Sequence, residues 1–232
     1  MENRLFRFEA VSEEAILVSV RDPKLALVER NELVALLNGV LKSSPPKWLT
    51  DLVPSYDTLL IYFDWRQVDS YFVINKIKEL QLIASNHLGK THKIPVFYGA
   101  PEDKYPLDLQ NVADVHKMFQ QEVIKSHQQR PYRVFSVGFL PNFAYLGELM
   151  SDIATPRLKT PRTYVPAGAV AIADRQTAIY PQRSQGGWQI LGYTPVDLRK
   201  HEGFSVGDHV EFYPIDLPTY DRMKNGETSA AN

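Results

Sequence analysis

Arginines are concentrated between Pro131 and Pro195, in the part of the sequence best suited to bind a small anion. The basic residues of this stretch are Arg133, Arg157, Lys159, Arg162, Arg175 and Arg183, and the acidic ones are Glu148, Asp152 and Asp174. The whole chain, by contrast, carries a net charge of −1. Frequent prolines and glycines shape the loops between these residues. Because a guanidinium on a stiff loop suits a carboxylate or a phosphate, we predict an anion site here.

Two of these arginines are the leading candidates for contact with the anion. Arg157 and Arg162 lie five residues apart, and each follows a proline that restricts the local backbone. The planar fork of a guanidinium favours bidentate contact with a carboxylate or phosphate. The alternative is a pair of surface arginines in solvated salt bridges, which contribute little to stability.

Further candidates lie close to the arginines in the sequence. Ser184 stands before Gly186 and Gly187, whose backbone N–H groups are candidates for an anion-binding nest. The remaining candidate binding residues are Asn142, Tyr145, Gln176 and Tyr180. Tyr145, together with Phe143, either lines the site or anchors its loop.

His127 is the candidate catalytic residue. It is predicted at the end of a helix, directly before the strand that leads to the loop at 138–141. An imidazole exchanges a proton near neutral pH, so His127 is a candidate proton donor or acceptor. The alternative is a capping role, in which a protonated ring is stabilised by the helix dipole.

Trp188 has two interpretations, a wall of the ligand site or a packed core residue. It is followed by the strand-like run Gln189–Tyr193. Alternation along a strand places Trp188 and Ile190 on one face and Tyr193 on the other. This pattern favours the core.

Composition argues against several other kinds of site and partner. The chain has no cysteine, its histidines follow no ligand spacing, and we predict no metal site. It carries none of the common signatures of phosphate loops, nucleophile elbows or zinc proteases. With 26 basic and 27 acidic residues, nucleic acid is not expected as a partner. No long apolar stretch predicts a membrane span, and we expect a cytoplasmic protein.

The first hundred residues alternate between strand-like and helical spacing. Strands are predicted at 4–10, 15–20, 48–53, 58–65 and 94–98, and helices at 25–41 and 68–88. Leaving aside the first strand, the order is βαββαβ, which is the ferredoxin-like arrangement. We therefore predict a ferredoxin-like α/β domain over residues 1–95.

The rest of the chain follows a different pattern. Asp108 is a candidate cap for a helix that runs to Met118, and a shorter helix is predicted near 122–127. From Tyr132 onward, short apolar runs separated by proline and glycine predict a β-barrel, giving a second domain over 96–217. The polar residues 218–232 are predicted to form a disordered tail. The predicted fold class is therefore α+β.

Five segments of this chain resemble one family of proteins. The segments are DLVPSYDTLLIYFD (51–64), VIKSHQQRPYRV (123–134), GFLPNFAYLGEL (138–149), TPRLKTPRTYVPAGAVAIA (155–173) and QTAIYPQRSQGGWQILGYTP (176–195). They are similar to the family variously called the B-type subunit of 5-oxoprolinase, allophanate hydrolase subunit 1 or Kip-type histidine-kinase inhibitor. The resemblance implies that the barrel is cyclophilin-like and that a histidine is usual at position 127.

The resemblance implies two classes of function. In the first, the chain is a subunit of an ATP-dependent 5-oxoprolinase that opens 5-oxoproline to glutamate. Such a subunit pairs with a homologous C-type subunit, shares ATP with its partner, requires an A-type subunit and is inactive alone. An allophanate hydrolase-type subunit follows the same logic. In the second class, the chain is an antikinase that binds and inhibits a sensor histidine kinase.

This sequence departs from the family pattern at several positions. Asn142, Asp174 and Ala178 stand where glycine is usual, and Ala144 and Gln185 stand where proline is usual. Asparagine and aspartate tolerate positive φ better than most residues, so we expect the backbone shape to be preserved at 142 and 174. The added side chains are expected to reduce the space at the site.

Overall fold

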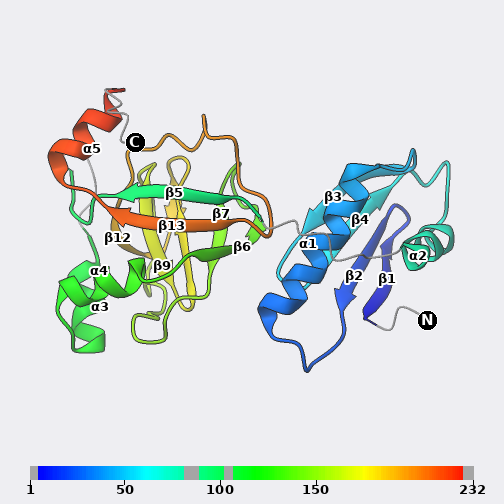
Figure 1. Ribbon diagram of the computed structural model, residues 1–232, viewed down its shortest axis with the longest axis horizontal. Coiled ribbons are helices and arrows are strands. Elements are labelled where there is room, and N and C mark those ends of the chain that lie inside the picture. The colour runs from blue at the N-terminus through cyan, green and yellow to red at the C-terminus, as the bar shows by residue number, and fades with distance from the viewer. Residues whose placement is uncertain (1–4, 81–88, 102–106, 227–232) are drawn as a thin grey trace. The chain divides into compact units, whose positions relative to one another are not determined.

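The computed structural model describes residues 5–80, 89–101 and 107–226 (Figure 1). The chain divides into two compact units, Met1–Gly89 and Lys90–Asn232. The predicted boundary after residue 95 falls inside strand β5 (Thr91–Val96), which belongs to the second unit. Each unit has its own hydrophobic core.

A four-stranded antiparallel sheet forms the first unit. Its strands are β1 (Phe6–Ser12), β2 (Ala15–Val20), β3 (Leu49–Pro54) and β4 (Thr58–Phe63), in the spatial order β1-β2-β4-β3. Two helices, α1 (Leu27–Ser43) and α2 (Ser70–Glu79), share the core of this sheet. Residues alternate along β4, so Leu59 and Ile61 are buried while Leu60 and Tyr62 lie half-buried on the other face.

Local signals explain where the two helices begin and end. Helix α1 ends before Pro45 and Pro46, as the sequence predicts. At the start of α2, the Asp69 carboxylate accepts a hydrogen bond of 2.8 Å from the Phe72 N–H. Helix α2 has its C-cap at Leu80, and the predicted continuation towards Leu88 lies outside the described residues.

The ferredoxin-like order predicted for the first unit is not confirmed. The predicted last strand of that order is β5, and it pairs with a strand of the second unit instead. Strand β2 lies between β4 and β1, and β1 is the strand that the predicted order left aside. Periodicity identified β5 as a strand but carried no information on its partner.

A seven-stranded sheet forms most of the second unit. Its strands, in spatial order, are β12 (Gln189–Tyr193), β9 (Ala169–Ala173), β10 (Gln176–Ile179), β7 (Ala144–Gly147), β6 (Tyr132–Val137), β13 (His209–Pro214) and β5. The pairing of β5 with β13 is parallel, and Figure 1 shows the two strands side by side. A separate two-stranded ribbon consists of β8 (Arg162–Val165) and β11 (Ser184–Gly186).

The seven-stranded sheet is nearly closed, which confirms the predicted barrel. Phe97, just beyond β5, exchanges two backbone hydrogen bonds of 2.9 Å with Tyr193 at the end of β12. All seven strands contribute side chains to one buried cluster, which is the barrel interior. Val170 and Ile172 of β9 point into that interior, and the alanines of β9 point outward into a second, aromatic cluster.

Three helices accompany the barrel. Helices α3 (Leu109–His116) and α4 (Gln120–Gln128) contribute Val112 and Val123 to the barrel interior. Helix α5 (Leu217–Lys224) covers the first part of the 218–232 tail that was predicted to be disordered, so that prediction is wrong for residues 218–224, and residues 227–232 lie outside the described residues. Tyr220 of α5 is buried, with its ring 6.0 Å from the ring of Phe97, so an aromatic anchor holds this helix. No helix in the described part of the chain is long and apolar enough to cross a bilayer.

Candidate functional site

An aromatic cluster of Phe143, Tyr145, Tyr180 and Trp188 lies at the centre of the predicted binding residues. The ring of Phe143 is 4.9 Å from Tyr145, 5.4 Å from Tyr180 and 6.0 Å from Trp188, centroid to centroid. Small side chains on the outer face of β9 share the same core. The cluster therefore forms a packed platform on the outside of the barrel.

Trp188 belongs to the core, as strand alternation predicted. Its side chain is only 5% exposed and shares a buried cluster with Ile190. The same pattern wrongly placed Tyr193, which joins this cluster instead of facing the other way. The register of β12 shifts between Ile190 and Gly192, and such a bulge reverses the faces of the residues after it.

Arg157 is the predicted arginine that remains available for a ligand. Its guanidinium lies 5.8 Å from the ring centroid of Trp188, and the residue is exposed. Arg183, also exposed, stacks on Tyr164 at 4.1 Å. Neither arginine has a carboxylate partner in the part of the chain that the structure describes. Both groups are therefore held over aromatic rings with their hydrogen-bond donors open to an anion.

Arg162 does not have the exposed position expected for an anion ligand. Its Nη2 lies 2.5 and 2.7 Å from the two carboxylate oxygens of Asp108, and its Nη1 donates to the Trp188 carbonyl at 3.1 Å. Its side chain is 18% exposed. Asp108 is the N-cap residue of α3, as predicted, but its side chain makes no capping hydrogen bond. Arg162 is therefore committed to Asp108, a partner that sequence spacing did not reveal.

The predicted nest at Ser184, Gly186 and Gly187 is not formed. Ser184 and Gly186 lie in β11, and neither glycine has the positive φ that such a concavity uses. Gly186 has a spatial role instead, since a Cβ atom there would overlap the hydroxyl group of Tyr180. Ser184 donates to the neighbouring carbonyl of Gln185 at 3.1 Å.

Tyr180 is held as a neutral phenol beside the two arginines. Burial raises the pKa of Tyr180 to about 12, while Arg157 and Arg162 act in the opposite direction. The hydroxyl group also hydrogen-bonds to the backbone of Trp188. Tyr180 is therefore a hydrogen-bonding residue rather than a base at neutral pH.

The loop at 138–142 contains two residues with positive φ. Asn142 has φ 62°, and its side-chain amide donates to the Leu198 carbonyl at 2.8 Å. Asp174, in another turn, has φ 51°, so the predicted backbone shapes at both substituted positions are confirmed. Phe139 also has positive φ, at 73°, and is 63% exposed. Sequence reasoning missed Phe139, because a phenylalanine rarely takes positive φ.

His127 lies inside the barrel, away from the aromatic cluster on its outer face. Its side chain is fully buried, its ring is stacked 4.7 Å from that of Phe212, and its carbonyl accepts from the Tyr132 hydroxyl at 2.8 Å. Burial lowers the pKa of His127 to about 3, so the ring is neutral near pH 7. The interpretation of His127 as a protonated helix cap is therefore wrong. Its neutral, fully enclosed ring also cannot reach a ligand outside the barrel.

The partners of His127 determine which ring nitrogen carries its proton. Thr177 Oγ1 donates to the Ala171 carbonyl at 3.2 Å and lies 2.8 Å from His127 Nε2. The Thr177 oxygen therefore accepts a hydrogen bond from Nε2–H, and Nδ1 accepts one of 2.7 Å from the Tyr98 hydroxyl. Every polar atom of the ring is thus paired, as a buried structural histidine requires.

Gln176 is a residue of the barrel wall and is not a member of the aromatic cluster. It is half-buried in β10 and pairs with Gly147 and Ala173 of the neighbouring strands. The region around Trp188 therefore brings together three of the predicted residues: exposed Arg157, half-buried Tyr145 and buried Tyr180. It offers cations and aromatic faces, which suit binding of an anion, and places no predicted proton-transfer residue beside them. No metal-ligand cluster occurs among the described residues.

The sequence matches a protein-family model and several named bacterial proteins. Residues 6–203 match the family described as carboxyltransferase domain, subdomain C and D. A Haemophilus influenzae protein, named as the B-type subunit of 5-oxoprolinase, is 34% identical over 87% of this chain and 94% of its own length. The protein of the same name from Bacillus subtilis is 31% identical over 84% of this chain and 87% of its own length.

Solved structures show the same fold. The crystal structure of TTHA0988 is 31% identical, with a TM-score of 0.76, over 90% of this chain. This chain spans 41% of that chain, which therefore contains a large additional part. The Kluyveromyces lactis urea carboxylase covers 97% of this chain at 17% identity, with a TM-score of 0.70, and is similar in fold alone. The chain thus belongs to the carboxyltransferase subdomain C and D family, together with bacterial proteins named as the B-type subunit of 5-oxoprolinase.

Proposed function

We propose that this chain is a cytoplasmic subunit of an ATP-dependent 5-oxoprolinase, which opens 5-oxoproline to glutamate. The proposal rests first on the relatives named as the B-type subunit of 5-oxoprolinase, which match most of the chain. Their name describes one part of an assembly. We accordingly propose that the chain is inactive alone and is completed by a homologous C-type subunit and an A-type subunit.

The observation in this molecule that carries the proposal is the position of Arg157. Its guanidinium is exposed, stacked over Trp188 and without an acidic partner among the described residues. 5-Oxoproline carries one carboxylate, which suits a guanidinium fork. Tyr145, half-buried in β7, borders the same platform and offers an aromatic face to the lactam ring, while buried Tyr180 supports it from below.

A lactam is a poor electrophile because resonance stabilises its amide bond. Phosphorylation of the lactam oxygen, the chemistry that ATP would supply when bound, makes the ring carbon electrophilic enough for water to add and the C–N bond to break, after which phosphate would leave from the opened chain. The exposed arginines Arg157 and Arg183 fit a phosphate by charge and by their free donors. The same two residues would stabilise negative charge that develops during the reaction.

Reconstitution with partner subunits tests the proposal. The chain is co-expressed with a C-type and an A-type subunit, and ATP turnover is measured with and without 5-oxoproline. We expect turnover that depends on 5-oxoproline and on all three subunits. Arg157→Ala should raise KM for 5-oxoproline about tenfold, as expected for the loss of a charged hydrogen bond.

The matched control is Arg199→Ala. Arg199 is also exposed, but it forms a hydrogen-bonded pair of 2.9 Å with Asp197 close to it in the sequence. Its removal should leave KM unchanged. A folded three-subunit mixture without 5-oxoproline-dependent turnover would reject the proposal. Inhibition of a sensor histidine kinase by the chain alone would then favour the antikinase alternative, and turnover with allophanate would favour the other hydrolase.

A further inference from the structure

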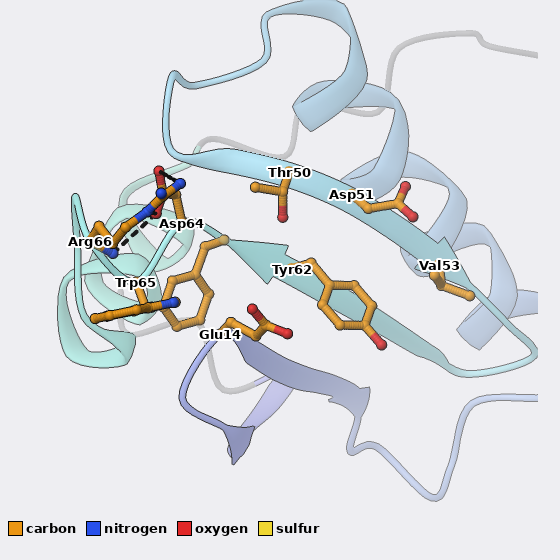
Figure 2. A pocket seen from close by; sticks show the side chains of 9 residues that line it. Glu14, Thr50, Asp51, Val53, Tyr62, Asp64, Trp65 and Arg66 are labelled. Atoms are coloured by element: carbon orange, nitrogen blue, oxygen red, sulfur yellow. Dashed lines mark hydrogen bonds and ion pairs between the residues drawn. The ribbon is translucent and has the colours of Figure 1, made fainter.

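A pocket of about 620 Å³ lies on the face of the first unit's sheet that the two helices leave uncovered (Figure 2). Tyr62 of β4 lies in the middle of it, with Glu14 on one side and Asp51 on the other. Trp65 stands at one end. The pocket shares no residue with the aromatic cluster on the barrel, and the proposed function does not use it.

Strand pairing accounts for Asp51, and Glu14 comes from the turn before β2. Tyr62 pairs with Asp51 of β3 on one side and with Ala15 of β2, the residue after Glu14, on the other. Neighbouring strands lie about 4.8 Å apart, so the backbones of Asp51 and Glu14 stand about 10 Å apart on either side of β4. The β-bulge between Leu49 and Asp51 fixes which face Asp51 occupies.

The two carboxylates lack cationic partners. Oδ1 of Asp51 accepts a hydrogen bond of 2.8 Å from the Leu52 N–H, and no ion pair within the described residues involves Asp51 or Glu14. The third acidic residue of the pocket, Asp64, is neutralised by Arg66, with contacts of 2.9 and 3.2 Å. The lining therefore carries two uncompensated negative charges and no uncompensated positive one.

Trp65 offers an accessible aromatic ring at the end of the pocket. Its side chain is 57% exposed, whereas Trp48 is 9% and Trp188 is 5% exposed. The ring can therefore be reached by a molecule in the pocket. The electron-rich face of tryptophan attracts cations, and the uncompensated carboxylates favour the same charge.

We propose that this pocket binds an organic cation, a guanidinium or alkylammonium group that stacks on Trp65 and pairs with Glu14 and Asp51. Two carboxylates beside a tryptophan suit an organic cation, and no group of three or more metal-ligating residues occurs among the described residues. The volume of the pocket is within the range of sites for small molecules. The cation has two possible sources, a basic side chain of another polypeptide and a free small molecule.

Nuclear magnetic resonance of the full chain tests the proposal directly, because the three tryptophan indole N–H groups report separately. Trp65→Phe assigns the signal of Trp65. The probes are agmatine, a capped Gly-Arg-Gly peptide and the same peptide with neutral citrulline in place of arginine. At low salt, the two cations should shift the Trp65 signal with saturation and leave those of Trp48 and Trp188 in place, and citrulline should have no effect.

Charge-neutral variants give the second readout. Glu14→Gln and Asp51→Asn should each weaken binding of the arginine peptide about threefold, as expected for an exposed ion pair. The matched control is Glu13→Gln, which removes the same charge from the adjacent exposed residue outside the pocket lining. Equal effects of Glu13→Gln and Glu14→Gln, or equal binding of the citrulline peptide, would overturn the proposal. Agmatine binding as tightly as the peptide assigns a small-molecule source, and tighter peptide binding assigns a polypeptide.

Discussion

Asp108 and Arg162 join the start of α3 to the two-stranded ribbon, through contacts of 2.5 and 2.7 Å between Nη2 and the two carboxylate oxygens. The Asp108 carboxylate also accepts from the Ile190 N–H at 2.6 Å, and the Asp108 N–H donates to the Ile190 carbonyl at 2.7 Å. One aspartate thus connects α3, β8 and β12. The pair supports the platform of the candidate site without being available to a ligand.

Replacement of Arg162 should therefore destabilise the second unit. Arg162→Ala leaves the largely buried Asp108 without its cation, and we expect a loss of about 1–3 kcal/mol in the free energy of unfolding. Urea denaturation followed by tryptophan fluorescence measures this loss. Arg162→Lys keeps a positive charge near Asp108 and should lose less. Wild-type stability in Arg162→Ala would show that the pair contributes nothing.

Trp188 should behave as a core residue when it is truncated. Trp188→Ala removes a ring that contacts Phe143 and Tyr145 and should cost about 3–5 kcal/mol, because the surrounding structure closes the cavity only in part. Trp188→Phe retains a ring and should cost less. Thermal unfolding by calorimetry compares the two variants. An unchanged melting temperature in Trp188→Ala would place Trp188 in the binding site instead.

His127 should make stability depend on pH. The pKa of His127 is lowered by burial to about 3, below the value near 6.5 expected in the unfolded chain. Between these pH values the unfolded chain binds the extra proton, so stability is full above pH 6.5 and falls as pH decreases towards 3. Each pH unit in this window contributes at most about 1.4 kcal/mol.

His127→Gln removes this titration while keeping a polar side chain. Urea denaturation at pH values between 4 and 8 should give a shallower pH dependence for the variant than for the wild type. Thr177→Val is the complementary test, since it leaves the His127 N–H unpaired and should cost about 1–3 kcal/mol at pH 7. Parallel pH profiles for wild type and His127→Gln would contradict the buried neutral histidine.

Gly168 should not tolerate a side chain. It has φ +83°, and a Cβ atom there would lie 2.7 Å from the Thr194 carbonyl oxygen. Gly168→Ala should therefore cost about 1–3 kcal/mol in unfolding free energy. Gly138→Ala in the same unit is the control, because a Cβ there meets nothing within 4 Å. Similar melting temperatures for the two variants would contradict the expected strain.

The sequence predicted features that depend on neighbouring residues. Asn142 and Asp174 take positive φ as expected, since that preference resides in the residue itself. The end of α1 before Pro45 follows for the same reason. The core position of Trp188 followed from strand alternation over the next few residues.

Features that depend on distant partners were not predictable in this way. Arg162 was expected at the surface, because nothing in its local sequence identifies Asp108, 54 residues earlier, as its partner. His127 was expected at a loop site, yet its ring lies inside the barrel against Thr177, 50 residues later. Strand β5 was assigned to the first unit for the same reason, since a strand pattern does not name its neighbour.

The parallel pairing of β5 with β13 has a consequence for the order in which the chain folds during synthesis. All four strands of the first unit lie within residues 6–63, so its sheet is complete early. In the second unit, by contrast, the first strand, β5, cannot pair until the last strand, β13, has been synthesised. The hydrogen bond from the Lys90 N–H to the Asp208 carboxylate, just before these strands, spans 118 residues. Until β13 leaves the ribosome, β5 has an unpaired edge, the kind of edge that invites pairing with another chain. A chain truncated before His209 should therefore keep a folded first unit and aggregate through its second.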